Sequence, residues 1–472
     1  MTNWLPTLQD SSAPIYLRLA DSIESDIDSG ALPAGEKLPP QRNLAYDIGV
    51  TIGTVGRAYS LLRERGLVSG EVGRGTYVLN RDTRTPVRTE PPLTSTRGGT
   101  RFFESVPGKL RFDSTAAPNV GQGKVIEGLL AAITREQPDD VASYTRTFPS
   151  SWFDAGSKWL SRNGFQPAPE SIVPTLGAHS AVIAVISALT SPGDHILFEH
   201  VTYSQLARSA GLIGRRLALV QSDEHGVDPD DFERVCAQRH PVMAFLMPTA
   251  QNPTGAIMPA ERRMAIAKVA KKYNVLLIED DLYGALTEDQ TPLLAEYAPE
   301  RTFVVGGLSK SVAAGVRGGW VSCPANFRHG IRTAHKMVTG GMPFLLAELC
   351  ARLVLSGEAT AIRSRSLAEI NARLALAHAA LEGQSYSGNA NVPFLWLSLP
   401  EPWHSGTFKN AAYEQGVMID DEDEFKSGRS DRIYHRVRIG VSASRNRDDV
   451  VTGLAVIRRL LDEGGAGYDS FG

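Results

Sequence analysis

The chain has 472 residues, of which 42% are hydrophobic and 21% are charged, and its formal net charge is −3. This length exceeds what one compact core usually supports, so we expect two or more domains. The charge excludes a polycation, so any contact with nucleic acid must come from a local basic patch.

The cysteines and the apolar runs indicate where the protein works. The three cysteines, Cys236, Cys323 and Cys350, lie far apart without metal-ligand spacing. This sparse, odd count favours a reducing compartment and predicts no metal site. The first residues, MTNWLPTLQDSS, lack the basic start and apolar core of a secretory signal. The longest helix-like apolar run, residues 181–189, is too short to cross a bilayer, so we expect a cytoplasmic protein without membrane contact.

The sequence pattern divides the chain into three zones. Residues 1–79 form a small unit with helix and hairpin signals. Residues 80–112 are rich in arginine, threonine, proline and glycine without sustained periodicity, which is typical of a linker. Residues 113–472 alternate strand-like apolar runs with helical patterns, which indicates an α/β domain.

The first zone reads as three helices and a hairpin. An apolar residue at every fourth position over residues 15–27 predicts an amphipathic helix. A short helix over residues 41–48 and a longer one over residues 51–65 follow, and Thr51 suits the N-cap of the longer helix. Two β-type segments surround a glycine-rich tip in residues 67–79. This order of elements predicts a winged helix–turn–helix.

Charge within this zone and in the linker after it favours DNA as a partner. Basic residues outnumber acidic ones over residues 37–74 and again over residues 81–111, so both segments could neutralise phosphates. The first positions of the second helix in such a motif usually reach base edges, whereas the first helix and the hairpin tip suit backbone contacts. A small helical domain with a solvated charged face is the alternative. The candidate DNA-binding residues are Arg42, Thr51, Thr54, Arg57 and Arg74.

Residues 35–78 resemble the GntR-type winged-helix DNA-binding domain. The chain departs from that pattern at Pro40 and places Gly53 and Gly56 inside the recognition helix, where each glycine costs about 1 kcal/mol relative to alanine. The resemblance implies that double-stranded promoter DNA is a partner. It rests on Leu38-Pro39, Arg42, Thr54-Val55, Ala58-Tyr59 and GRGTYV at residues 73–78.

In the large zone, four apolar runs each end in polar residues. In an open parallel sheet, ligands bind beyond the carboxyl ends of the strands. If the four runs are neighbouring parallel strands, one cleft receives all of these side chains. They are Tyr203, Asn252 in NPTG, Asp280 and Tyr283 in EDDLYG, and Ser309 and Lys310 in LSK.

Pyridoxal 5′-phosphate (PLP) is a ligand that needs this set. Lys310 supplies an amine that forms a Schiff base with its aldehyde. Asp280 can hold the proton on the ring nitrogen, because a nearby carboxylate favours the cationic form. Asn252 and Tyr283 can donate to the ring oxygen, and Tyr203 can stack on the ring. We therefore predict a PLP site in which Lys310 and Asp280 are the catalytic residues.

A second set of residues suits the phosphate of that cofactor. A phosphate is bound by backbone N–H groups at a helix start together with hydroxyl and guanidinium donors. Gly177 opens into a predicted helix at Ala178 and His179, and Ser309 and Arg317 supply the other donors. Each motif is weak alone, since NPTG is a turn sequence and a lone Ser-Lys pair is usually surface. Together their order and positions after strands fit one ligand.

Residues 112–461 resemble fold-type I aminotransferases, near the kynurenine/aminoadipate subgroup, through NPTG, EDDLYG, SKSVAAGVRGGW and VRIGVSAS. The resemblance implies that Arg438 clamps a substrate α-carboxylate, a bidentate task suited to guanidinium. It also implies that Tyr144 reaches the phosphate of the neighbouring subunit. A structural ion pair for Arg438 and a packed surface position for Tyr144 are the alternatives. His179 stands where glutamine is common, and Gly307 where a phosphate-binding serine is common.

A GntR-type winged helix, a linker and an aminotransferase-like domain form the arrangement of the MocR/GabR family of transcriptional regulators, which the chain resembles over nearly its whole length. The resemblance implies a homodimer that senses an amino acid or amine effector by aldimine exchange at Lys310, with weak or absent turnover. Two alternatives stay open: an active aminotransferase with a fused autoregulatory DNA-binding domain, and a PLP-level sensor. We expect the acidic run over residues 420–428, DDEDEFKSG, to be a solvated loop.

Overall fold

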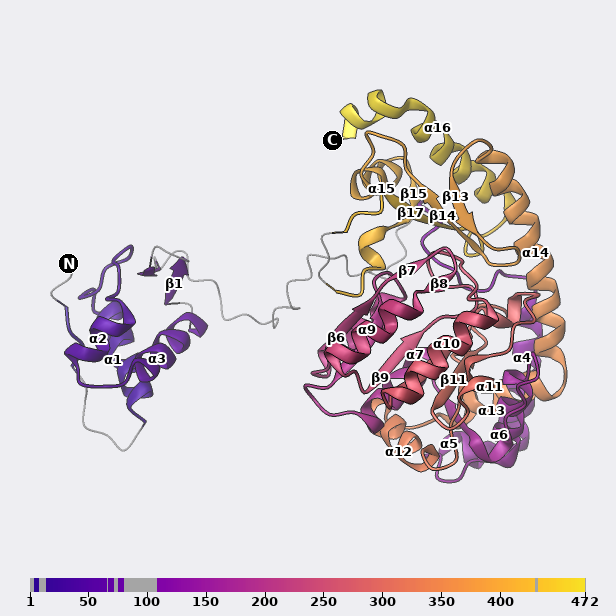
Figure 1. Cartoon of the computed structure of the whole chain (residues 1–472), viewed down its shortest axis with the longest axis horizontal. Helices are drawn as coiled ribbons and strands as arrows, with labels where there is room; N and C mark the ends of the chain where they lie inside the picture. The colour runs from indigo at the N-terminus through magenta and orange to yellow at the C-terminus, as the bar shows by residue number, and fades with distance from the viewer. Residues whose placement is uncertain are drawn as a thin grey trace. The chain divides into compact units, whose positions relative to one another are not determined.

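The computed structural model describes residues 4–7, 14–65, 67–71, 75–79, 108–428 and 432–471. The chain separates into two compact units, Met1–Arg97 and Gly98–Gly472 (Figure 1). Across the described ranges, no helix combines the length and the apolar character needed to span a membrane.

The smaller unit has the order of elements that the sequence predicts. Leu19, Ala20 and Ile23 of the first helix are buried in its core, whereas Ile15, at the start of that helix, is 46% exposed. The two strands pair antiparallel, so this unit is a three-helix winged helix–turn–helix. Its elements are α1 (Ile15–Asp28), α2 (Gln41–Asp47), α3 (Ile52–Glu64), β1 (Val68–Glu71) and β2 (Gly75–Val78).

Helix α3 is continuous despite its two glycines. Its buried face carries Tyr59, whose hydroxyl donates to the carbonyl of Pro39 at 2.8 Å and so ties α3 to the turn before α2. A Cβ on Gly56 would lie 3.3 Å from Oε1 of Gln41, whereas one on Gly53 would meet only Thr51 Oγ1 at 3.8 Å. A side chain at Gly56 would therefore press on Gln41 of α2, whereas one at Gly53 would make only an ordinary contact.

The larger unit is built on a seven-stranded sheet in the order β4-β12-β11-β10-β9-β5-β6. Five adjacent strands, β11, β10, β9, β5 and β6, run parallel to one another. Strand β12 is antiparallel to both of its neighbours, β11 and β4. The four predicted strands β5, β9, β10 and β11 are thus parallel neighbours, which confirms that their carboxyl ends meet at one edge. The strands are β4 (Ile172–Thr175), β5 (His195–Glu199), β6 (Arg216–Val220), β9 (Met243–Leu246), β10 (Leu276–Asp280), β11 (Thr302–Gly307) and β12 (Gly319–Ser322).

Helices cover both faces of this sheet. Ile196 and Phe198 of β5 belong to the core that includes α7 (Gly177–Leu189), and Leu197 belongs to the core that includes α9 (Pro229–Arg239) and α10 (Ala260–Lys272). Figure 1 shows α9 and α10 lying over the strands. With both faces buried, only the strand ends and the loops after them are open to a ligand.

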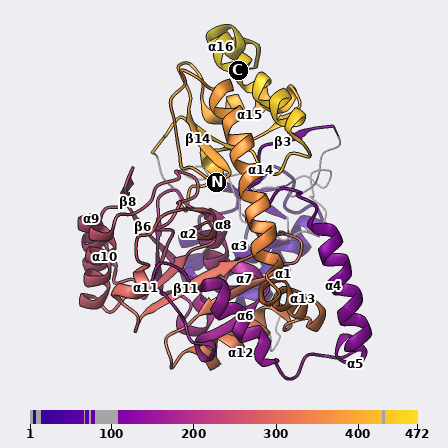
Figure 2. The ribbon, with the colours of Figure 1, turned by 90° about the vertical axis from the view of Figure 1, so that its right-hand side faces the viewer.

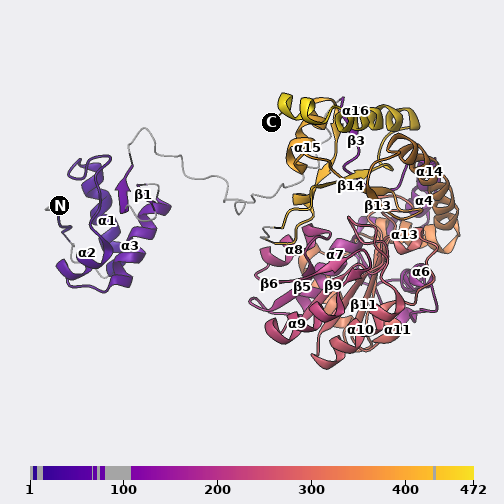
Figure 3. The same cartoon turned by 45° about the horizontal axis from the view of Figure 1, so that its top comes forward.

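A second sheet of four strands, in the order β13-β14-β17-β16, lies in the same unit. Figure 3 shows α15 and α16 beside it, and Figure 2 shows the long helix α14 running between this layer and α13. Helix α16 is interrupted at Gly464. These elements are α13 (Phe344–Leu355), α14 (Glu358–Ala380), β13 (Tyr386–Gly388), β14 (Phe394–Ser398), α15 (Ser405–Glu414), β16 (Asp420–Asp421), β17 (Arg436–Gly440) and α16 (Arg447–Phe471).

The end of the segment predicted as a linker belongs to the larger unit. Strand β3 (Leu110–Arg111) pairs in parallel with β15 (Val417–Met418), and Phe112 is fully buried. Residues 80–107 lie outside the described residues, so the linker stays a prediction there. The remaining elements are α4 (Gln122–Glu136), α5 (Pro138–Ala142), α6 (Ser150–Leu160), η2 (Pro169–Ser171), α8 (Ser204–Leu212), β7 (Ser222–Asp223), β8 (Gly226–Val227), η3 (Gly284–Leu286), α11 (Leu294–Tyr297), α12 (Arg328–Thr339) and η4 (Glu422–Glu424).

Candidate functional site

A cavity of about 520 Å³ in the larger unit gathers residues that follow the ends of β4, β5, β9, β10 and β11. It brings together every residue that the sequence predicted for the cofactor or its substrate, except Tyr144. Those that line it are Ala178, His179, Tyr203, Asn252, Asp280, Tyr283, Ser309, Lys310, Arg317 and Arg438.

Lys310 follows β11 and lies in a chain of polar groups. Its Nζ donates to Thr115 Oγ1 at 3.0 Å, and the hydroxyls of Thr115 and Tyr283 lie 2.7 Å apart. The same Nζ lies 5.7 Å from the ring centre of Tyr283. Sequence reasoning did not find Thr115, because it follows no strand-end motif that would mark it. These contacts hold the Lys310 amine in the cavity, as a Schiff-base lysine requires.

Asp280 is the last residue of β10 and is 3% exposed. Its carboxylate accepts a hydrogen bond from the backbone N–H of Leu282 at 3.0 Å, and among the described residues it makes no ion pair. The pKa of Asp280 is raised to about 7, chiefly by burial and in part by the neighbouring Asp281, while the Leu282 hydrogen bond and the Lys310 charge oppose the shift. A cationic ring nitrogen would place an opposite charge directly beside this buried carboxylate, so the residue fits the PLP pyridine.

The start of α7 fits the cofactor phosphate. Gly177 has φ +82, and a Cβ on Gly319 would come within 2.6 Å of Gly177 Cα, so the backbone is closely packed here. The guanidinium of Arg317 lies beside this turn and donates to the carbonyl of Leu176 at 3.5 Å. Burial and the nearby Arg317 lower the pKa of His179, which favours a neutral imidazole. The N-terminus of the 13-residue helix α7 and the Arg317 guanidinium thus meet at the turn around Gly177, and this arrangement suits an anion.

Arg438, predicted to clamp a substrate carboxylate, is held by residues of this chain. It lies on β17 and forms an ion pair with Asp420, the residue opposite it on β16. Its Nη1 donates to Asn252 Oδ1 at 2.8 Å, and its Nη2 donates to the carbonyl of Asp113 at 2.9 Å. The guanidinium lines the cavity, but its carboxylate partner here is internal.

The acidic run over residues 420–428 is not the solvated loop that the sequence predicted. Part of it forms β16, which pairs with β17, and the next turn is η4. Lys409 lies 3.3 and 3.5 Å from two of its carboxylates, and Lys426 lies 2.9 Å from a third. Strand pairing and these cations keep the carboxylates inside, and Asp423 alone among the five acids is exposed. The buried members are Asp420, Asp421, Glu422 and Glu424.

Tyr144 lies away from the cofactor cavity of its own chain. It follows α5, is 92% exposed, and lines a separate hollow of about 1190 Å³ with Arg146, Arg328 and Lys336. Its contact with a neighbouring subunit therefore stays a prediction. The three cysteines are buried and free, and among the described residues no group of three or more His, Cys, Asp or Glu side chains could hold a metal ion.

In the smaller unit, Thr51 and Thr54 cooperate at the start of α3. Thr51 caps the helix, because its Oγ1 accepts from the backbone N–H of Thr54 at 3.2 Å. The two hydroxyls also lie 2.9 Å apart. Arg42 on α2 and Arg57 on α3 are both accessible to solvent, as DNA contacts require. Arg74 lies outside the described residues.

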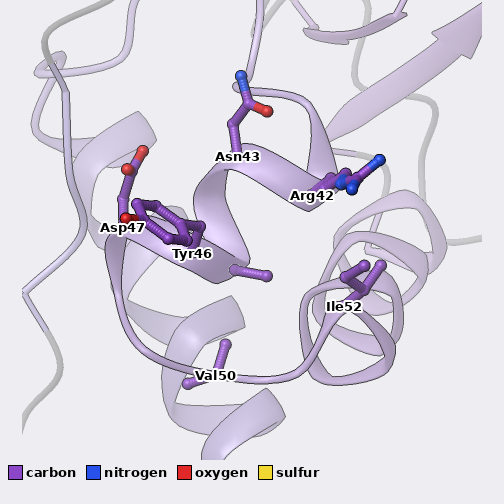
Figure 4. Close-up of a pocket in the computed structure, with 7 residues that line it drawn as sticks. Arg42, Asn43, Tyr46, Asp47, Val50 and Ile52 are labelled. Atoms are coloured by element: carbon purple, nitrogen blue, oxygen red, sulfur yellow. The ribbon is translucent and has the colours of Figure 1, made fainter.

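Figure 4 shows a hollow between α2 and the start of α3, which Arg42, Tyr46 and Ile52 line. Tyr46 is 88% exposed and Ile52 is 52% exposed. Sequence reasoning did not single out these two residues. The signal that could have found them is their position outside the buried stripe of each helix, because neighbouring apolar side chains left in solvent can form a patch that marks an interaction site.

Two family matches cover most of the chain. Residues 115–457 match the family described as "Aminotransferase class I and II", and residues 15–78 match "Bacterial regulatory proteins, gntR family". Among curated proteins, the chain is 29% identical over 463 residues to the uncharacterized HTH-type transcriptional regulator YdeF of Bacillus subtilis, covering 98% of this chain and 97% of that protein. It is 24% identical over 360 residues to the probable rhizopine catabolism regulatory protein MocR of Rhizobium meliloti, covering 72% and 71%.

Among solved structures, the α-aminoadipate aminotransferase LysN of Thermus thermophilus matches with a TM-score of 0.68 and 22% identity, covering 75% of this chain and 92% of that one. This likeness gives the larger unit a fold-type I aminotransferase fold, and that fold and its structural neighbours imply PLP as the cofactor. The chain belongs to the class I and II aminotransferase family and carries a GntR-type DNA-binding domain before it, the arrangement of the MocR-type transcriptional regulators.

Proposed function

We propose that the protein is a PLP-dependent transcriptional regulator that senses an amine or amino acid effector at Lys310 and transmits its binding to promoter DNA. One observation carries the proposal. The cavity that gathers Lys310, Asp280 and the start of α7 belongs to the same chain as a winged helix–turn–helix.

Different residues of the cavity would hold different parts of the cofactor. PLP, when bound, supplies an aldehyde that reacts with amines and a ring that withdraws electrons. Asp280 would hold the proton on the ring nitrogen, and Tyr203 would stack on the ring. Asn252 and Tyr283 would donate to the ring oxygen. The first N–H groups of α7, with Ser309 and Arg317, would bind the phosphate.

Lys310 is the residue through which an effector acts. PLP, when bound, would supply an aldehyde for which the Lys310 amine and an effector amine compete. Where the effector is bound, Lys310 would be a free amine in the cavity, within hydrogen-bond reach of Thr115. An effector shifts the protein between two states only if it binds one of them more tightly. The freed Lys310 side chain and the occupied cavity supply that difference.

A homodimer is part of the proposal. Tyr144 is 92% exposed on its own chain and does not line the cofactor cavity. This supports its expected contact with the phosphate bound by a neighbouring subunit. Met337, 76% exposed, lines the same hollow as Tyr144, and a second chain would cover both residues.

The test compares the binding of DNA by three forms of the full chain: holo-protein, apo-protein and the Lys310→Ala variant. The probe is the DNA upstream of the protein's own gene, measured by fluorescence anisotropy at fixed salt. We expect the holo-protein affinity to differ from that of the other two forms by about fivefold or more, the lower end of a typical coupling between sites. Equal affinities of all three forms would overturn the proposal.

An active aminotransferase is the second candidate. The observation that favours it is the intact pair of Lys310 and Asp280 in one cavity, since these residues suffice to move a proton and to hold the ring charge. It requires that holo-protein release a carbonyl product from the amine that it binds. A regulator without turnover releases none.

A further inference from the structure

We propose that the effector of this site is a primary amine that brings no carboxylate to Arg438, because Asp420 of the chain itself already occupies that guanidinium. The inference rests on the proposed function, in which the cavity holds PLP at Lys310. It narrows the effector from amines and amino acids to amines alone.

The backbone builds the pair of Arg438 and Asp420. The two residues stand directly opposite each other in the antiparallel pairing of β17 and β16. Their side chains are 2% and 4% exposed and form an ion pair. Strand register sets this contact, so it does not depend on a chance side-chain conformation at the surface.

The Arg438 guanidinium also contacts other residues of this chain. It donates to Asn252 Oδ1 and to the carbonyl of Asp113. The rings of Phe425 and Phe394 have their centres 4.7 and 5.7 Å from its central carbon. An effector carboxylate that displaced Asp420 from Arg438 would leave a buried carboxylate without its partner, and such a loss is strongly unfavourable.

The remaining cations of the cavity have other partners or roles. Arg111 donates to the carboxylate of Asp113 from Nε at 3.1 Å and from Nη2 at 3.2 Å. Arg317 stands at the start of α7, where the phosphate would bind, and Lys310 reacts with the aldehyde. Among the described residues, no other arginine or lysine lines the cavity. Each cation of the cavity thus has an internal carboxylate partner or a role at the cofactor.

Further carboxyl groups lie on or near the wall beside Asp420. Glu424 also lines the cavity, and Asp421 lies next to Asp420 in the same run. Burial raises the pKa of both Asp421 and Glu424, although Lys409 contacts each of them and opposes the shift. Their burial with a shared cation shows that this wall disfavours further negative charge. An effector with a neutral or cationic tail suits it better than one with a carboxylate.

The experiment uses holo-protein and matched pairs of ligands that differ only by a carboxylate. The pairs are 2-phenylethylamine with phenylalanine, 3-methylbutylamine with leucine, and cadaverine with lysine. Visible absorption of the bound cofactor follows each titration, without keto acid. We expect at least one amine to change the spectrum at a concentration about tenfold or more below that of its amino acid, a difference that one displaced ion pair supplies. Amino acids that act as well as their amines, or no response to either class, would overturn the inference.

Substitution of Asp420 tests the cause of this preference. Asp420→Asn frees Arg438 from its internal carboxylate, so the affinity for amino acids should rise about tenfold relative to the affinity for amines. Asp423→Asn is the matched control, because Asp423 belongs to the same run but is exposed and does not line the cavity. In this control, the ratio of the effective amino acid concentration to the effective amine concentration should equal that of the wild type. An Asp420→Asn ratio that also stays unchanged would overturn the inference.

The Lys310→Ala variant tests the cofactor site separately from the choice of effector. If wild-type protein with PLP gives a visible band that Lys310→Ala lacks, the cofactor site is established whatever the ligand preference is. A preference for amino acids would then overturn only the choice of effector. If no Lys310-dependent band forms, the cofactor site and the inference fall together.

Discussion

Thr115 joins two residues that the sequence suggested separately. Its hydroxyl accepts a hydrogen bond from Lys310 and contacts the hydroxyl of Tyr283, and it is 3% exposed. Lys310 and Tyr283 could be predicted because each follows a strand end in a recognisable motif. Thr115 could not, because only the fold brings it to these two residues, which lie far from it in the sequence.

We predict that Thr115→Val weakens the binding of PLP by about tenfold, because it leaves the Lys310 amine and the Tyr283 hydroxyl without their shared partner in a buried site. Titration of PLP into apo-protein, followed by visible absorption, measures the dissociation constant. Thr115→Ser keeps the hydroxyl and is the control. Equal affinity of the valine and serine variants would show that the hydrogen bonds do not position Lys310.

Glu199 gives a prediction on the pH dependence of stability. This carboxyl, fully buried at the end of β5, accepts a hydrogen bond from Gln251 at 2.9 Å, and burial raises its pKa from 4.5 to about 7. The folded state therefore keeps a proton that the unfolded state has released between these values. Its contribution to stability is fully present below pH 4.5 and is lost as the pH rises to about 7.

Glu199→Gln should remove the loss of stability that wild-type protein shows as the pH rises to about 7. The variant should be more stable than wild-type apo-protein by about 1 kcal/mol or more at pH 8, and the difference should shrink toward pH 5. Urea unfolding followed by tryptophan fluorescence at both pH values measures the free energy of unfolding. A difference that is constant from pH 5 to pH 8 would show that Glu199 does not titrate in this range.

At the scale of elements, α3 combines a weak helix interior with a strong start. Gly53 and Gly56 lower its intrinsic helix propensity, and the Thr51 cap satisfies one of the open N–H groups of its first turn. The same first turn is the part of the helix that usually reads base edges. Local stability and DNA recognition therefore depend on the same few residues.

We predict that Thr51→Ala destabilises α3 by about 1 kcal/mol, since it removes the N-cap. Hydrogen exchange of the α3 amides in the full-length protein measures this change. Thr51→Ser retains a capping hydroxyl and should preserve protection. If the serine variant restores protection but not DNA affinity, the Thr51 methyl group contacts DNA in addition to its capping role. Unchanged protection in the alanine variant would contradict the prediction.

The elements also show why the sequence predicted one half of the site and not the other. The ends of β5, β9, β10 and β11 could be predicted because buried parallel strands are continuous apolar runs with polar residues after them. The burial of most of residues 420–424 could not, because it depends on pairing with β17 and on Lys409, both outside the run. An acidic stretch considered alone favours solvent, and only its partners reverse that preference.

At the scale of the whole molecule, the protein has to bind DNA despite a net charge of −3, so a few local cations must neutralise the phosphates. We predict that Arg57→Gln or Arg42→Gln weakens promoter binding and reduces the slope of log affinity against log salt by about 1 for each phosphate that the variant no longer neutralises. Arg458→Gln makes the same change of charge on α16 of the larger unit and should leave the slope unchanged. Identical slopes for all three variants would show that Arg42 and Arg57 do not contact DNA phosphates.

A visible-absorption titration of the holo-protein with amines and amino acids, without keto acid, distinguishes a sensor of amines from an enzyme that converts them. We expect a new spectrum that forms on ligand addition, stays constant with time and reverses when the ligand is removed. The same ligand should then change promoter binding. Steady loss of the visible band with recovery of a carbonyl product would contradict this expectation, because the protein would then turn over its ligand as an aminotransferase.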